Sequence, residues 1–247
     1  MSAVSVTFRL SLACAAALAW MTAAQAEVIV LSAKGGSLKA GDTIADNATI
    51  DLPSGATIEV LLPTGAMRTL SGPSKTAVAS LTKGEKPDAG LFSKVAELVG
   101  KTGGSESSIG AVRAAPATRA LRPPAFSWTA VPIEVDGDWC VEKGSPLSLV
   151  RSAGERPLKV TLVDVAASQR TELTFDAGKA DIPWPEAFAP KVGSYALLVP
   201  DRPMRQIRLR LIAPLPSRED TLRVLHGQRC EVQMRAFLSE LTQTAAR

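Results

Sequence analysis

Short apolar stretches separated by turn residues run through most of the chain, and they limit the folds that it can adopt. In the first part they fall at residues 27–31, 48–52, 57–62 and 66–70, with proline and glycine turns between them. In the second part they fall at residues 131–135, 139–141, 147–150, 158–163, 172–175, 195–199 and 207–212. Strands this short, with turns at regular spacing, are typical of antiparallel sandwiches and barrels. The sequence therefore predicts a mainly β protein with two small antiparallel sandwich- or barrel-like modules.

One short helix is expected between the two modules. It would begin at Pro87-Asp88 and end at Gly100, and its apolar face would contain Leu91, Phe92, Val95, Leu98 and Val99. We expect this face to pack on its own module. Residues 102–124 are rich in glycine, serine, alanine and proline, which predicts a flexible linker. The boundaries expected are thus 27–101 for the first module, 102–124 for the linker and 125–247 for the second module.

A second helix is expected near the C-terminus. Ser217 and Asp220 form a start that resembles a capping box, and Gly227 should break or bend the helix. Beyond Gly227 the apolar stripe consists of Cys230, Met234, Phe237, Leu238 and Leu241. We expect this helix to pack on the second sheet.

The first twenty-six residues have the pattern of a cleavable secretory signal. Arg9 precedes an apolar run of about a dozen residues, and Ala24-Gln25-Ala26 is a small-x-small cleavage signature. We therefore expect a periplasmic protein that is cleaved after Ala26 and has no transmembrane segment afterwards. A lipoprotein signal ending at Cys14 is the alternative, but Ser11 stands where that signal needs an aliphatic residue.

Cleavage would leave two cysteines, Cys140 and Cys230. In an oxidising compartment an even pair is most simply a disulfide, and two reduced structural thiols are the alternative. A bridge closing about 90 residues would contribute on the order of 4 kcal/mol in the chain-entropy model. It would join the C-terminal helix to an early strand of the second module.

Composition excludes several classes of function. The formal net charge of +4 is too small for a dedicated nucleic-acid binder, and 4% aromatic residues give little stacking surface for single strands. A single histidine, His226, excludes a multi-histidine metal centre within one chain. A metal held by His226 and the two cysteines would lack a fourth ligand. We expect no cofactor and no metal.

The stretch 28–78 resembles a known family. It contains Leu38-Lys39-Ala40-Gly41-Asp42-Thr43-Ile44, then Ala48-Thr49-Ile50 and the run from Ser54 to Leu62, and it ends in Arg68-Thr69-Leu70-Ser71-Gly72-Pro73. These motifs resemble a FecR-type domain, the periplasmic β-domain of bacterial iron-citrate regulators and of many exported proteins. The resemblance covers less than a quarter of the exported chain. It implies sensing or interaction in the periplasm. FecR-type regulators carry a cytoplasmic segment that contacts a sigma factor and a transmembrane helix, whereas this chain is expected to have a cleavable signal, so it looks more like the exported relatives of the family. The second module resembles no family that we identify.

Several enzyme-like patterns lack the rest of their motif. Ser80-Leu81-Thr82-Lys83 and Lys101-Thr102-Gly103 match parts of the penicillin-recognising enzymes, but the third element of that set is missing. Ser217, Asp220 and His226 lie too close together along one helix for a catalytic triad. Asp136-Gly137-Asp138 is interpreted as a hairpin turn, and Trp184 as a buried side chain under a loop.

Four arginines cluster around the last predicted strand: Arg202, Arg205, Arg208 and Arg210. Arg208 and Arg210 should project from one face, opposite Ile207, Leu209 and Leu211. Such a cluster can bind an anionic polymer or an acidic partner, and it can equally be a solvated strand face. We expect a non-enzymatic protein that acts in envelope signalling or assembly by binding another envelope protein. The alternative is a binding module for an anionic envelope polymer or glycan through these arginines.

Overall fold

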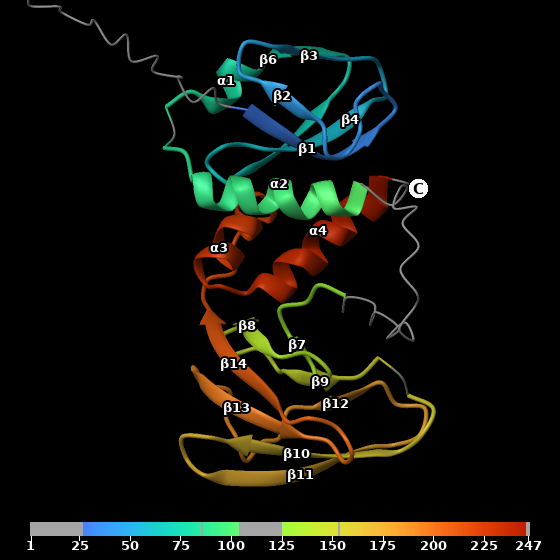
Figure 1. The fold of residues 1–247 in the computed structure, drawn as a ribbon, viewed down its shortest axis with the longest axis vertical. Coiled ribbons are helices and arrows are strands. Elements are labelled where there is room, and N and C mark those ends of the chain that lie inside the picture. Colours follow the sequence, from blue (N-terminus) through green and yellow to red (C-terminus); the bar gives the residue numbers. More distant parts are fainter. Residues whose placement is uncertain (1–26, 85, 104–124, 153, 246–247) are drawn as a thin grey trace, which may run out of the picture.

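The computed structural model describes residues 27–84, 86–103, 125–152 and 154–245 (Figure 1). The predicted signal at 1–26 lies outside these residues, and so does most of the predicted linker. The chain forms two β modules with a layer of helices between them, as Figure 1 shows. The described helices include none that is both long and apolar enough to cross a membrane.

The first module consists of six strands: β1 (Glu27–Lys34), β2 (Thr43–Ala45), β3 (Thr49–Leu52), β4 (Thr57–Leu61), β5 (Met67–Ser71) and β6 (Ser74–Ala77). An antiparallel sheet has the order β2-β1-β4-β5, and β3 pairs separately with β6. Its own core contains Val28, Val30, Ile50, Ile58 and Val60. Gly72 follows β5, and a Cβ there would lie 1.9 Å from the carbonyl oxygen of Pro53, so only glycine fits.

The second module has eight strands: β7 (Ala130–Pro132), β8 (Gly137–Glu142), β9 (Ser148–Val150), β10 (Leu158–Asp164), β11 (Gln169–Phe175), β12 (Asp181–Pro183), β13 (Gly193–Leu198) and β14 (Arg205–Ile212). A five-stranded sheet has the order β11-β10-β13-β14-β8, and it faces a three-stranded sheet, β12-β9-β7. The core between them contains Trp139, Leu162, Phe175, Tyr195 and Leu209.

The helices are α1 (Val78–Thr82), α2 (Ala89–Gly103), the 3-10 turn η1 (Arg218–Asp220), α3 (Thr221–Gly227) and α4 (Glu231–Ala245). The Ser217 side chain accepts a hydrogen bond from the amide of Asp220, and α3 ends at Gly227, so the predicted start and break are both confirmed.

A third core joins the two modules through these helices. Ile29 and Leu31 of β1 contact the same cluster as Leu91 of α2 and Met234 and Leu238 of α4. Helix α4 therefore packs on the second module, as predicted, and also on β1, which was not predicted. The face of α2 likewise contacts both its own module and the C-terminal helices.

The predicted fold class is confirmed, with two refinements in pairing. Strand β8 pairs with β14 in parallel, and β7 pairs with β9 in parallel. In both pairs the intervening chain makes other strands or turns before it returns, which a parallel connection needs. The short elements β2, β6, β12 and α1 were not predicted, because each has too few large apolar residues to form a pattern.

Candidate functional site

The predicted arginines lie on and beside β14, at the open side of the five-stranded sheet. Ile207 and Leu209 are buried in the core of the second module, as predicted. Arg208 and Arg210 alternate with them, so they project from the opposite side of the sheet, which we call the outer face. Arg208 is exposed and Arg210 is half-buried.

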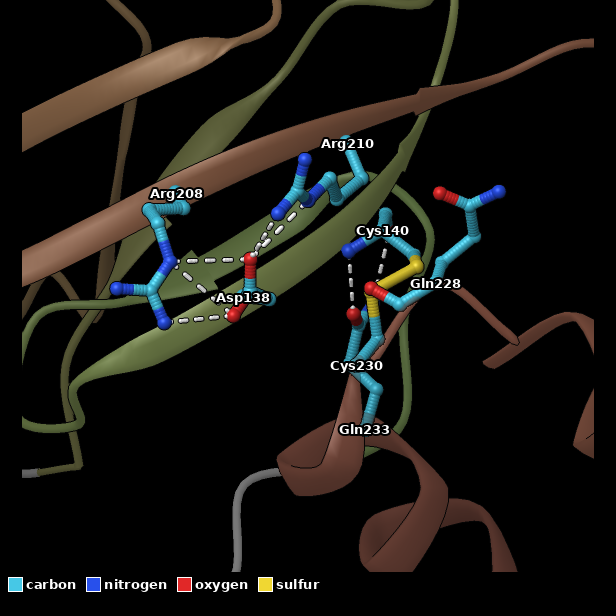
Figure 2. A network of polar contacts seen from close by, with 7 residues as sticks. All are labelled: Asp138, Cys140, Arg208, Arg210, Gln228, Cys230 and Gln233. Carbon is cyan, nitrogen blue, oxygen red and sulfur yellow. Dashed lines mark hydrogen bonds and ion pairs between the residues drawn. A yellow bond between two sulfur atoms is a disulfide. The ribbon is translucent and has the colours of Figure 1, made fainter. Parts of the chain in front are cut away.

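An aspartate of the neighbouring strand binds both of these arginines. The parallel register places Asp138 of β8 beside Arg208. The Arg208 Nε donates to both carboxylate oxygens at 3.1 Å, and its Nη2 donates to Oδ2 at 2.7 Å. Arg210 donates from Nε to Oδ1 at 3.1 Å, and its Nη2 lies 3.0 Å from the same oxygen (Figure 2). One carboxylate thus holds two guanidinium groups in place.

This network changes the acidity of its members. The hydrogen bond from Arg208 holds the pKa of the Asp138 carboxyl below its usual value, although burial acts in the opposite direction. The same hydrogen bond raises the pKa of Arg208. Asp138 therefore stays ionised at neutral pH and compensates part of the positive charge of the arginines.

Arg205 is paired in the same way at the start of β14. Its Nη1 lies 2.7 Å from Asp136 Oδ2, while Asp136 Oδ1 accepts a hydrogen bond from the amide of Gln206. The interpretation of residues 136–138 as a hairpin turn was wrong, because Gly137 and Asp138 belong to β8. Strand pairing with β14 keeps this segment extended and gives the two aspartates arginine partners.

Arg202 lies apart from the other three arginines. It borders a shallow depression of about 380 Å³ that is lined by Glu134, Arg151, Ser152, Glu155, Arg156, Pro157 and Leu158 as well. Arg151 is buried there, and its guanidinium donates to the carbonyl oxygens of Gly154, Arg156, Asp176 and Lys179. These contacts hold the surrounding loops, so Arg151 has a structural role.

The predicted disulfide is present between Cys140 of β8 and Cys230, with the two Cα atoms 5.9 Å apart. Beside it, the Gln233 side chain of α4 binds the edge of β8. Its Oε1 accepts from the amide of Cys140 at 2.6 Å, and its Nε2 donates to the carbonyl oxygen of Cys140 at 2.8 Å (Figure 2). The buried amide of Gln233 therefore takes the place of a neighbouring strand.

Exposed apolar side chains lie on and beside the outer face. Four large apolar side chains are well exposed: Val165 (53%), Val192 (60%), Leu198 (43%) and Met204 (52%). Leu198 is the last residue of β13 and alternates with the buried Leu197, so it lies on the outer face. The other three lie in the loops directly next to β10, β13 and β14. Val165 lies near Val192, because its amide donates to the carbonyl of Ser194, and Leu198 and Met204 flank the paired residues Leu197 and Arg205.

Several residues of the site were not predicted. They are Asp138 and Asp136 as partners of the arginines, Gln233 as the cap of the β8 edge, and the exposed apolar residues. The Arg-x-Arg spacing of Arg208 and Arg210 carries a usable signal, since a period of two places both on one side of a strand. No sequence signal shows that the two strands are neighbours.

The remaining candidates have structural roles in the described part of the chain. The Ser217 hydroxyl bonds to Asp220 and caps a helix turn. Trp184 is buried, and its ring N–H donates to the carbonyl of Phe188 at 2.6 Å. Among the residues that the structure describes, no group of three histidine, cysteine or acidic side chains is placed to hold a metal ion.

Comparison with known protein families, with curated proteins and with solved structures found no match. The outer face of the five-stranded sheet, with its paired arginines and its exposed apolar side chains, is the surface that these residues single out.

Proposed function

We propose that this chain is a non-enzymatic, exported protein that works in bacterial envelope signalling or assembly by binding another envelope protein. The contact surface is the outer face of the five-stranded sheet. The single observation that carries this proposal is the exposure of Leu198 on that face together with Val165, Val192 and Met204 in the loops at the ends of its strands. Single exposed apolar residues are ordinary on protein surfaces, but several beside one sheet are typical of an interaction site.

The arginines add ordered hydrogen-bond donors to this surface. Asp138 orients Arg208 and Arg210, so their guanidinium groups are held in place before a partner arrives. A side chain that is already ordered loses less conformational entropy on binding. Arginine is also enriched where proteins meet, because its planar group both stacks and donates hydrogen bonds.

The assignment to the envelope depends on residues 1–78 and on the disulfide. The pattern of residues 1–26 is that of a secretory signal, and residues 28–78 resemble FecR-type domains. A disulfide between Cys140 and Cys230 fits an oxidising compartment. These observations support export together with a role in protein interaction.

Photo-crosslinking inside the producing cell tests the proposed surface. A photoreactive residue replaces Leu198, or in a second variant Met204, and the adducts are identified by mass spectrometry. Because both side chains are exposed, neither substitution should disturb the core. We expect both positions to give an adduct with the same envelope protein.

A matched control places the photoreactive residue at Lys75, an exposed residue on β6 of the first module. This control protein should not give the adduct. The proposal fails if neither Leu198 nor Met204 yields a protein adduct, or if Lys75 yields the same one at equal strength.

The alternative function, binding of an anionic envelope polymer or glycan, would use Arg202, Arg205, Arg208 and Arg210. Three of these already bind Asp136 or Asp138, which lowers the positive charge that they offer to a polyanion. Retention on purified envelope polymer that disappears in an Arg208→Ser, Arg210→Ser protein would favour this alternative. Unchanged retention would exclude it.

A further inference from the structure

The two ends of the five-stranded sheet differ in how their strand edges are covered. At one end, the edge of β8 is closed by the side chain of Gln233 and by α4. At the other end, β11 is seven residues long and pairs only with β10. An open edge of this length offers unpaired amide and carbonyl groups to a further strand.

The edges of the other sheets are protected in ordinary ways. Strands β7 and β12 have three residues each and contain Pro132 and Pro183, which cannot donate a ladder hydrogen bond. Strand β2 also has only three residues, and β5 has Arg68 paired with Glu219 of the 3-10 turn. In the part of the chain that the structure describes, β11 is thus the longest edge strand without a cover or a proline.

The side chains of β11 are complementary to themselves. Arg170 and Glu172 are both exposed and lie two residues apart, so they share one side of the strand. Within the described residues, neither has an ion-pair partner. When two copies of β11 pair antiparallel about Thr171, Arg170 lies opposite Glu172 of the partner subunit, and this pair occurs twice by symmetry.

We propose that β11 binds β11 of a second copy of this chain in this antiparallel register, centred on Thr171. The two five-stranded sheets then form one continuous sheet with a twofold axis at its middle. The arrangement is isologous, since the same strand is used on both sides. In this register residue 171 pairs with 171, 170 with 172, and 169 with 173. The two members of each pair lie an even number of positions apart, so their backbone groups have the same direction relative to the shared edge, as an antiparallel ladder requires.

A second copy fits this edge better than an unrelated extended peptide for a physical reason. Charges on an edge strand normally prevent pairing with other chains. Here the two opposite charges prevent most registers but support the twofold one, because cross-strand pairs of opposite charge stabilise a sheet and like charges destabilise it. The β11 sequence thus selects its own copy.

Charge reversal tests the register directly. The protein is expressed from its full 247-residue chain, purified under non-reducing conditions, and its mass is measured by light scattering and sedimentation over a wide range of concentrations. We expect the unaltered protein to be a dimer. Glu172→Arg and Arg170→Glu should each weaken the dimer by about thirty-fold, because both twofold pairs become repulsive.

Complementation separates the proposed register from a general effect of charge. The double variant Arg170→Glu, Glu172→Arg should dimerise like the unaltered protein. The two single variants should also form a mixed dimer with each other, since one then carries two carboxylates and the other two guanidinium groups. Asp51→Arg, an exposed carboxylate on β3 of the first module, is the matched control and should leave the dimer unchanged.

Three results would overturn the proposal. The first is an unaltered protein that remains a monomer at the highest concentration reached. The second is a Glu172→Arg protein whose dimer is as stable as that of the unaltered protein. The third is a double variant, or a mixture of the single variants, that remains monomeric while both single variants stay folded by circular dichroism.

Discussion

The sheet of the first module is covered on both faces, whereas the larger sheet of the second module has its outer face covered only at one end, where α4 packs on β8. In β1, the four consecutive residues Val28 to Leu31 are all buried, because even positions face the module's own core and odd positions face the helices. In β10, buried and less buried residues alternate. Buried area therefore stabilises the first sheet from two sides, and it stabilises the second sheet from one side except at β8.

The difference shows what a continuous apolar stretch means in a short strand. Alternation of apolar and polar residues indicates a strand with one solvent-exposed face. An unbroken apolar run indicates that other elements pack on both faces of the strand. For the first module the second cover is supplied by α2 together with α3 and α4, and the last two helices come from the other end of the chain. The open face of the second module remains available for binding.

Among the changes considered, removing the disulfide should lower the free energy of unfolding most. Replacing Cys140 and Cys230 by alanine should lower the free energy of unfolding by about 4 kcal/mol, because 90 residues then separate two unlinked positions in the unfolded chain. The measurement is urea denaturation of the variant and of the unaltered protein. Chemical reduction of the unaltered protein should give a loss of similar size. A loss below about 1 kcal/mol would contradict the expectation.

Two leucines on the two sheets allow a matched test. Leu31 lies under the helices and is fully buried, whereas Leu198 lies on the open face with 43% exposure. Leu31→Ala should lower the free energy of unfolding by about 3 kcal/mol, since it leaves a cavity. Leu198→Ala should change it by less than about 0.5 kcal/mol. Equal losses in urea denaturation would show that both faces are covered in solution.

The smallest expected change in stability comes from Asp138 on the outer face, and it depends on pH. The pKa of Asp138 is lowered by Arg208 in the folded protein, so its stabilising contribution is present at neutral pH and is lost as the pH falls below about 3.8. Asp138→Asn should cost about 1 kcal/mol at pH 7, since its partners are partly exposed and screened.

The check is urea denaturation at a series of pH values for both proteins. The difference between them should shrink as Asp138 becomes protonated. A difference that stays constant down to pH 3 would show that the carboxylate charge contributes nothing.

Much of the strand content could be predicted, because it depends on local pattern. The run at residues 57–62 and the alternation at residues 207–212 predicted β4 and β14 with small errors at the ends. The cap by Ser217 and the break at Gly227 are also local signals, and both are confirmed. The disulfide was predictable once only Cys140 and Cys230 remained.

The rest depends on which strands become neighbours. Asp138 and Arg208 are seventy residues apart in the chain, and only the parallel pairing of β8 with β14 brings them together. In the sequence, Gln233 is only one polar residue on an apolar helix face. Its role is evident only when the edge of β8 is seen beside it. Tertiary contacts of this kind leave no periodicity in the sequence.

The contact of α4 with β1 also determines when the protein can finish folding. Ile29 is synthesised about two hundred residues before Leu238, yet the two residues belong to one core. Contacts between such distant residues close slowly, and a growing chain cannot make them at all. Until α4 is made, α2 alone among the helices from the N-terminal half can cover this side of the first module's sheet. A chain that ends before α4 would have every strand of that module and still expose part of its apolar side to aggregation.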